Sequence, residues 1–163
     1  MSFYQKVKLL LFIFLLPNCK QSCPKSPTHK EYNIIISDNF NQEQKEIIKN
    51  GTNFWLNNNN LKFSFDTKNN NDFIIIDKKS FRNPYKLGSH SQLMNNHYVL
   101  LSQEDSLNNL KLRNIVIHEI GHAIGISHVK NQNSIMFPLI LKNKYTLTSI
   151  DKLELCKVSC CIE

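Results

Sequence analysis

The chain has 163 residues, of which 41% are hydrophobic, and a formal net charge of +7. This length predicts a single domain plus a targeting segment, and the apolar content excludes an intrinsically disordered chain. The positive charge favours anionic surfaces or acidic substrates, but the lysines are scattered rather than clustered with aromatic residues. We therefore expect a solvated basic surface and no nucleic-acid partner.

The first segment, residues 1–18, has the pattern of an export signal. Lys6 and Lys8 precede an unbroken apolar run over residues 9–16, which is too short to span a bilayer as a mature helix. The run ends in the letters LPNC, which resemble a bacterial lipoprotein signal with Cys19 as the acylated residue. We expect a cell-envelope lipoprotein that meets the membrane only through this lipid. The alternatives are secretion after ordinary cleavage and, third, a retained signal anchor.

Residues 19–30 are polar and contain two prolines, so they are predicted to be a tether ahead of a folded domain over residues 31–163. Besides Cys19, four cysteines would remain in an oxidising setting: Cys23, Cys156, Cys160 and Cys161. Cys23 could pair with one of the other three and tie the ends of the domain together, or the last three could form a partly free thiol cluster. Connectivity cannot be read from spacing alone.

Strand and helix signals follow in chain order. Residues 32–37 contain Ile34-Ile35-Ile36 and predict a buried strand. A helix is expected after Asn41, which can cap it, with an apolar face formed by Ile47, Ile48, Phe54 and Trp55. Three further strands are predicted: a half-exposed one over residues 61–65, a buried one over 73–76 and another over 98–101.

Two more helices are predicted in the second half. One should begin near Asp105 or Ser106 and end at Gly125, with an apolar stripe made of Leu107, Leu110, Ile117, Ile120 and Ile124. The last should begin near Thr148, with Asp151 three residues on as its capping partner.

The motif HEIGHAIGISH lies at the end of the first of these helices. His118 and His122 are four apart, so both project from one helix face and can give a nitrogen each to one zinc ion. Glu119 lies at the edge of that site, where it can hold and deprotonate a metal-bound water without being a ligand. Gly125 tolerates the positive φ that reverses the chain, and the reversal can return His128 as a third ligand. Three protein nitrogens leave a fourth position open, which is typical of a catalytic zinc.

The alternative is a pair of core histidines with an unrelated methionine downstream. A glutamate and two histidines on so apolar a helix would be costly to bury without a metal or partners, which makes that interpretation the weaker one. A zinc hydrolase acting on small molecules has no supporting feature beyond the metal.

A second element, SIMFP at residues 134–138, completes a resemblance. The two motifs together resemble the metzincin zinc endopeptidases, and SIMFP is most similar to the matrixin form. The resemblance implies an α+β fold: a twisted mixed sheet with an antiparallel edge strand, an active-site helix, a Met-turn with Met136 beneath the metal as a structural residue, and a C-terminal helix. Pro138 stands where some metzincins have an extra tyrosine ligand, so that ligand is not expected.

The resemblance also implies a function. One catalytic zinc would be bound by His118, His122 and His128, and Glu119 would assist attack of a zinc-bound water on a peptide bond. We expect a monomeric endopeptidase acting on protein or peptide substrates. The alternative is a cell-surface binding module on a metzincin scaffold with little or no turnover.

Three finer expectations rest on the same resemblance. The edge strand that pairs with extended substrate should lie within residues 85–91. Leu139, Ile140 and Leu141 would wall the pocket for the residue after the scissile bond and suggest a hydrophobic preference there. His90 and His97 are interpreted as non-ligands, because the Asp-rich surroundings of the matrixin structural zinc are absent, and calcium is not expected for the same reason.

Overall fold

The structure is a computed structural model of the chain, and it describes residues 30–57, 61–65, 72–103, 108–139 and 146–159. The predicted export signal, Cys19 and nearly all of the tether lie outside these ranges, as do Cys23, Cys160 and Cys161, so the expectations about them stay predictions. Among the described residues, no helix combines the length and apolar character needed to cross a membrane.

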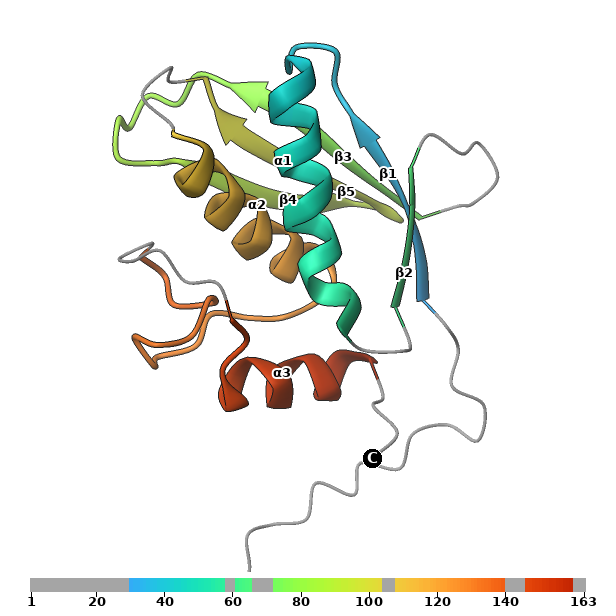
Figure 1. Cartoon of the computed structure of the whole chain (residues 1–163), viewed down its shortest axis with the longest axis vertical. Helices are drawn as coiled ribbons and strands as arrows, with labels where there is room; N and C mark the ends of the chain where they lie inside the picture. Colours follow the sequence, from blue (N-terminus) through green and yellow to red (C-terminus); the bar gives the residue numbers. More distant parts are fainter. Residues whose placement is uncertain (1–29, 58–60, 66–71, 104–107, 140–145, 160–163) are drawn as a thin grey trace, which may run out of the picture.

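A five-stranded mixed sheet forms one layer, with the strand order β2-β1-β3-β5-β4 (Figure 1). Its parallel members are β2 (Leu61–Phe65), β1 (Lys30–Ile36), β3 (Phe73–Lys79) and β5 (Asn96–Ser102). The edge strand β4 (Gly88–Leu93) is antiparallel to β5. The expected mixed sheet with an antiparallel edge strand is therefore confirmed, and that strand extends slightly beyond the range predicted for it.

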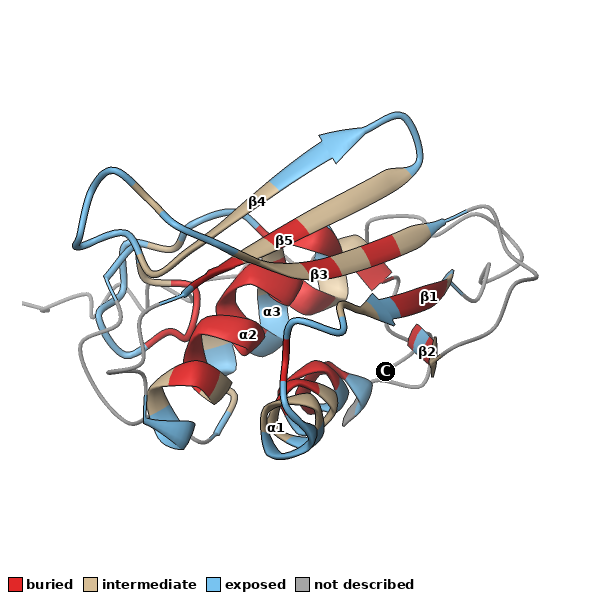
Figure 2. Cartoon of the chain, turned by 90° about the horizontal axis from the view of Figure 1, so that it is seen from above, coloured by how far each residue is buried: buried red, intermediate tan, exposed pale blue. Residues whose placement is uncertain are grey.

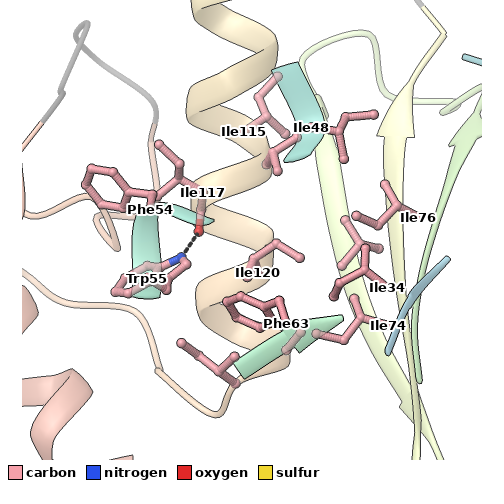
Figure 3. Close-up of a cluster of buried hydrophobic side chains, with 14 of the residues drawn as sticks. Ile34, Ile48, Phe54, Trp55, Phe63, Ile74, Ile76, Ile115, Ile117 and Ile120 are labelled. Carbon is pink, nitrogen blue, oxygen red and sulfur yellow. Dashed lines mark hydrogen bonds between the residues drawn. The ribbon is translucent and has the colours of Figure 1, made fainter. Parts of the chain in front are cut away.

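Helices α1 (Gln42–Asn53) and α2 (Asn109–Ala123) lie on the same face of the sheet (Figure 2). Ile34, Ile74 and Ile76 point toward them and are fully buried (Figure 3). The run Ile34-Ile35-Ile36 was expected to be buried throughout, but Ile35 is 41% exposed. Side chains alternate between the two faces of a strand, and Ile35 points to the face opposite these helices.

Helix α1 begins as predicted, with Asn41 and Gln44 forming a capping box. It ends at Asn53, however, so Phe54 and Trp55 lie in the 3-10 turn η1 (Phe54–Asn57) rather than on the helix. Trp55 is fully buried there, and its indole N–H donates a hydrogen bond of 2.8 Å to the carbonyl oxygen of Ile117 (Figure 3). This bond ties η1 to the middle of α2.

The expected start of α2 near Asp105 or Ser106 is wrong, because the helix begins at Asn109. Asn108 is the N-cap, and its side chain accepts a hydrogen bond of 2.9 Å from the backbone N–H of Lys111. Such a cap satisfies one of the amides that the first helical turn leaves unpaired. Leu110 is exposed and does not belong to the buried stripe.

The last helix, α3 (Ser149–Ser159), begins where the sequence predicts it. The hydroxyl of Thr148 accepts from the backbone N–H of Asp151 at 3.2 Å, and the carboxylate of Asp151 accepts from the backbone N–H of Thr148 at 2.9 Å. These reciprocal bonds form the expected capping arrangement.

Candidate metal centre

The chain reverses direction directly after α2, and Gly125 makes the reversal. Its φ is +102°, a value that L side chains rarely adopt. The backbone N–H of Ile126 donates to the carbonyl of Gly121 at 2.9 Å, and that of Gly125 donates to the carbonyl of His122 at 3.0 Å. This pair of bonds is a Schellman motif, which ends the helix and redirects the following residues toward its last turn.

The reversal brings His128 to the two helical histidines. Its Nε2 atom lies 3.2 Å from Nε2 of His118 and 3.1 Å from Nε2 of His122. A tetrahedral zinc with bonds of about 2.0–2.1 Å holds its ligand nitrogens roughly 3.3 Å apart. The donor set therefore fits one zinc ion bound by three imidazoles, and it is the only group of three or more potential ligand residues found among the described residues.

The opposite ring nitrogens of two of these histidines are engaged by backbone carbonyls. His118 Nδ1 lies 2.9 Å from the oxygen of Ile135, and His122 Nδ1 lies 2.8 Å from the oxygen of Ile126. A carbonyl oxygen only accepts, so each Nδ1 must carry the proton. Each Nε2 is then left with a lone pair directed at the common point, which is the tautomer that a metal needs.

Burial also keeps these rings neutral. Desolvation is the main cause that lowers the pKa of His118, to about 4, although the bond to Ile135 acts in the opposite direction. Burial likewise lowers the pKa of His122. Neutral imidazoles are the form that binds metal, so the fold keeps the ligands ready at neutral pH.

Glu119 lies beside this cluster and is buried. Burial raises the pKa of its carboxyl group to about 7, while the nearby positive charge of Lys86 partly opposes the rise. The carboxylate packs closely against Gly88 at the start of β4: a Cβ atom on Gly88 would lie 2.7 Å from Oε1 of Glu119. The missing side chain of Gly88 therefore makes the space that the carboxylate fills.

Met136 lies beneath the last turn of α2 and is fully buried. A Cβ atom on Gly121 would lie 2.4 Å from its sulfur and 2.9 Å from the Trp55 ring. The backbone N–H of Val129 donates to the carbonyl of Met136 at 2.9 Å, which pairs the segment after His128 with the turn. Met136 therefore packs against the helix turn that contains Gly121, and its role as a floor beneath the metal stays a prediction.

A buried carboxylate joins this turn to α3. Asp151 has no exposed surface. It accepts hydrogen bonds from the hydroxyl of Ser134 and, at 3.2 Å, from the backbone N–H of Ile135, in addition to Thr148. Because Ile135 also supplies the carbonyl that engages His118, the network connects α3 to a metal-binding ring.

His90 on β4 and His97 on β5 come together, with His90 Nε2 3.0 Å from His97 Nδ1. The His90 ring also lies 6.3 Å from the His122 ring, measured between centroids, at an interplanar angle of 25°. These two histidines do not belong to a group of three ligand residues in the described part of the chain. Their interpretation as non-ligands stays a prediction.

Two residues of the site were missed by sequence reasoning. Gly88 carried a usable signal, because an isolated glycine in a strand pattern often marks a close approach of another group. Lys86 carried none, since its proximity to Glu119 depends on how β4 packs against α2.

This chain is similar to known proteins in both sequence and fold. The profile of the matrixin family matches residues 25–158. Two solved structures of myroilysin are similar in fold. The first has a TM-score of 0.56, and the match covers 82% of this chain and 81% of the myroilysin chain. The second has a TM-score of 0.58, and the match covers 84% of this chain and 88% of the myroilysin chain. The sequence identity is 15% in both cases. At this identity the similarity concerns the fold alone. Among curated protein sequences there is no match.

Proposed function

The chain belongs to the matrixin family, and from that premise we propose that it is a zinc-dependent endopeptidase with Glu119 as its general base. One observation carries the proposal: three imidazole Nε2 atoms converge beside a buried carboxylate. A zinc ion held by His118, His122 and His128 would lower the pKa of a water molecule toward about 7 and polarise the scissile carbonyl.

Glu119 has the properties required for proton transfer. A general base works best when its pKa lies near the working pH, and burial moves the pKa of this carboxyl group in that direction. A cation bound by the histidines would favour the ionised carboxylate. Glu119 would accept a proton from the attacking water and return it to the leaving amine.

Strand β4 supports the binding of an extended peptide. It pairs with β5 on one side only, and no described strand pairs with its other side. A peptide adding to such an edge gains backbone hydrogen bonds, and its alternate side chains enter pockets. Because Gly88 of β4 contacts Glu119, a peptide paired there would pass directly over the histidine cluster.

The test compares the purified protein with a Glu119→Gln variant on an unfolded protein substrate, with and without a zinc chelator. We expect about one zinc per chain in both proteins. We also expect cleavage to fall roughly 10²–10⁴-fold in the variant, because the substitution removes the base and leaves the ligands. Metal analysis and product mass spectrometry measure the two quantities.

The second candidate is a binding module on the same scaffold with little turnover. Stoichiometric zinc without any cleavage that depends on Glu119 would favour that function. Cleavage that persists at full rate after complete removal of the metal would refute both.

A further inference from the structure

A pocket of about 330 Å³ opens beside Glu119. Three segments line it: residues 85–88 ahead of and at the start of β4, the pair His118 and Glu119 on α2, and residues 138–139 after the Met-turn. The pocket adjoins the base and one metal-binding ring. A substrate side chain next to the scissile bond is therefore the group that it would receive.

The lining of this pocket combines apolar side chains with the rings of Tyr85 and His118 and with two charged groups. Leu87, Pro138 and Leu139 supply apolar surface, which suits the stem of a long side chain. Glu119 supplies the only negative charge and Lys86 the only positive charge among the lining residues. Leu139 was expected to contribute to this wall and to a hydrophobic preference, whereas Ile140 and Leu141 lie outside the described residues. The presence of Lys86 in the lining replaces that expectation with a preference for a side chain that has an apolar stem and a charged end.

Backbone bonds hold the Lys86 segment in place. The N–H of Lys86 donates to the carbonyl of Asn83 at 3.0 Å, and the N–H of Ser102 donates to the carbonyl of Leu87 at 2.8 Å. The Lys86 ammonium lies 5.3 Å from the centroid of the Phe81 ring. Lys86 therefore belongs to an anchored turn that lines the pocket.

The charge of Lys86 is not neutralised by a local ion pair. In the part of the chain that the structure describes, four pairs lie within ion-pair distance, and none includes Lys86. Lys86 and Glu119 line the same pocket. A carboxylate entering the pocket would meet a cation that forms no ion pair with any described residue.

The opposing charge is that of Glu119. It lies deeper, next to the metal site, where the two positive charges of a zinc ion on three neutral imidazoles outweigh it. The electrostatic balance of the pocket thus favours a negative side chain over a positive one.

We propose that Lys86 selects the substrate residue that enters this pocket, favouring an acidic side chain over a neutral one and a neutral one over a basic one. The inference rests on the proposed function. The substrate that it predicts is a peptide with glutamate beside the scissile bond.

The test uses three peptides that are identical except for Glu, Gln or Lys at the position next to the cleaved bond. An exposed charge pair contributes at most about 1 kcal/mol. We therefore expect roughly threefold to fivefold faster cleavage of the Glu peptide than of the Gln peptide, and a similar factor between Gln and Lys. Lys86→Glu should invert the order. Lys49→Glu on α1 changes the net charge equally and should leave the order unchanged.

Two further measurements separate this inference from the proposed function. Added salt at about 1 M should reduce the differences in cleavage rate among the three peptides for the unmodified protein, because screening weakens charge interactions and does not change the shape of the pocket. Binding of the same peptides to Glu119→Gln and to Glu119→Gln with Lys86→Glu reports selection without turnover. A preference in binding with no cleavage would refute the endopeptidase and support selection by Lys86. Equal cleavage and equal binding of all three peptides, or an order that survives Lys86→Glu, would overturn the inference.

Discussion

At the residue scale, the tautomer of two of the three clustered histidines depends on the carbonyl oxygen beside the Nδ1 atom. Ile135 and Ile126 offer carbonyl oxygens to the Nδ1 atoms of His118 and His122, so both Nε2 atoms remain free for a metal. These carbonyls belong to the two turns that follow α2. The turns therefore do more than reverse the chain, because they set the tautomers of the helical histidines.

Gly88 packs closely against the carboxylate of Glu119, and its substitution tests the role proposed for that carboxylate. In Gly88→Ala the new methyl group would lie 2.7 Å from both Oε1 of Glu119 and Cγ2 of Ile115, so the carboxylate must move. We expect kcat/KM to fall by roughly 10–100-fold, because a displacement of about 1 Å at a reacting group can have that effect.

The matched control is Ser89→Ala, one position along the same strand. Zinc content should stay near one per chain in both variants, since the histidines are untouched. Full activity of Gly88→Ala at unchanged stability would contradict the inferred contact between β4 and the base.

At the element scale, Asp151 shows how one side chain joins two elements. The sequence predicted it as a helix cap, and the structure adds its bonds to Ser134 and Ile135. Local spacing revealed the first role because cap and partner are three residues apart. The second role spans 16 to 17 positions and follows only from the packing of α3 against the Met-turn.

Asp151→Ala should therefore affect both stability and metal binding. Loss of the carboxylate leaves the buried donors of Ser134 and Ile135 without this partner, at about 1–3 kcal/mol for each unsatisfied group. We expect the free energy of unfolding to fall by about 3 kcal/mol in urea titrations. Zinc affinity, measured by chelator competition, should fall by roughly tenfold or more, because Ile135 orients His118.

Glu154→Ala is the control for this change, because Glu154 forms an ion pair at the surface with Lys157 of the same helix. Its effect on stability should stay below about 1 kcal/mol. An Asp151→Ala protein with unchanged zinc affinity would show that the Met-turn holds its shape without α3.

At the scale of the whole molecule, the fold keeps several imidazoles in surroundings that disfavour their charge. Burial lowers the pKa of His118 and of His90 to about 4 in each case. An unfolded chain has imidazole pKa values of about 6.5. Between these values the two imidazoles bind more protons in the unfolded state, so they remove stability as the pH falls. The raised pKa of Glu119 acts in the opposite direction, but it is one group against two, so the metal-free fold loses stability overall.

We therefore expect the free energy of unfolding of the chelator-treated protein to decrease progressively from pH 6.5 to pH 4. Urea unfolding followed by tryptophan fluorescence measures it, since Trp55 is the single tryptophan and is buried. A His90→Asn variant should retain only part of the decrease. A free energy that stays constant or rises toward pH 4 would show that these rings are not held neutral by the fold.

The sequence was sufficient to predict the chemistry of the candidate metal site, because the residues that form it lie close together in the chain. The spacing of His118 and His122 places both rings on one face of any helix, and Gly125 permits the positive φ that returns His128. The order of apolar runs predicted most of the strands and helices, whereas the antiparallel edge strand was expected only from the resemblance to the metzincins.

Only the tertiary structure decided what surrounds that chemistry. The exposure of Ile35, the start of α2 at Asn109, the contact of Gly88 with Glu119 and the position of Lys86 each depend on segments far apart in the chain. Hydrophobic periodicity indicates which residues can be buried. The packing of β4 and α3 against α2 determines which side chains they contact. For this reason HEIGHAIGISH was sufficient to predict a metal site, whereas the fold around it determines the charge and shape of the adjoining pocket.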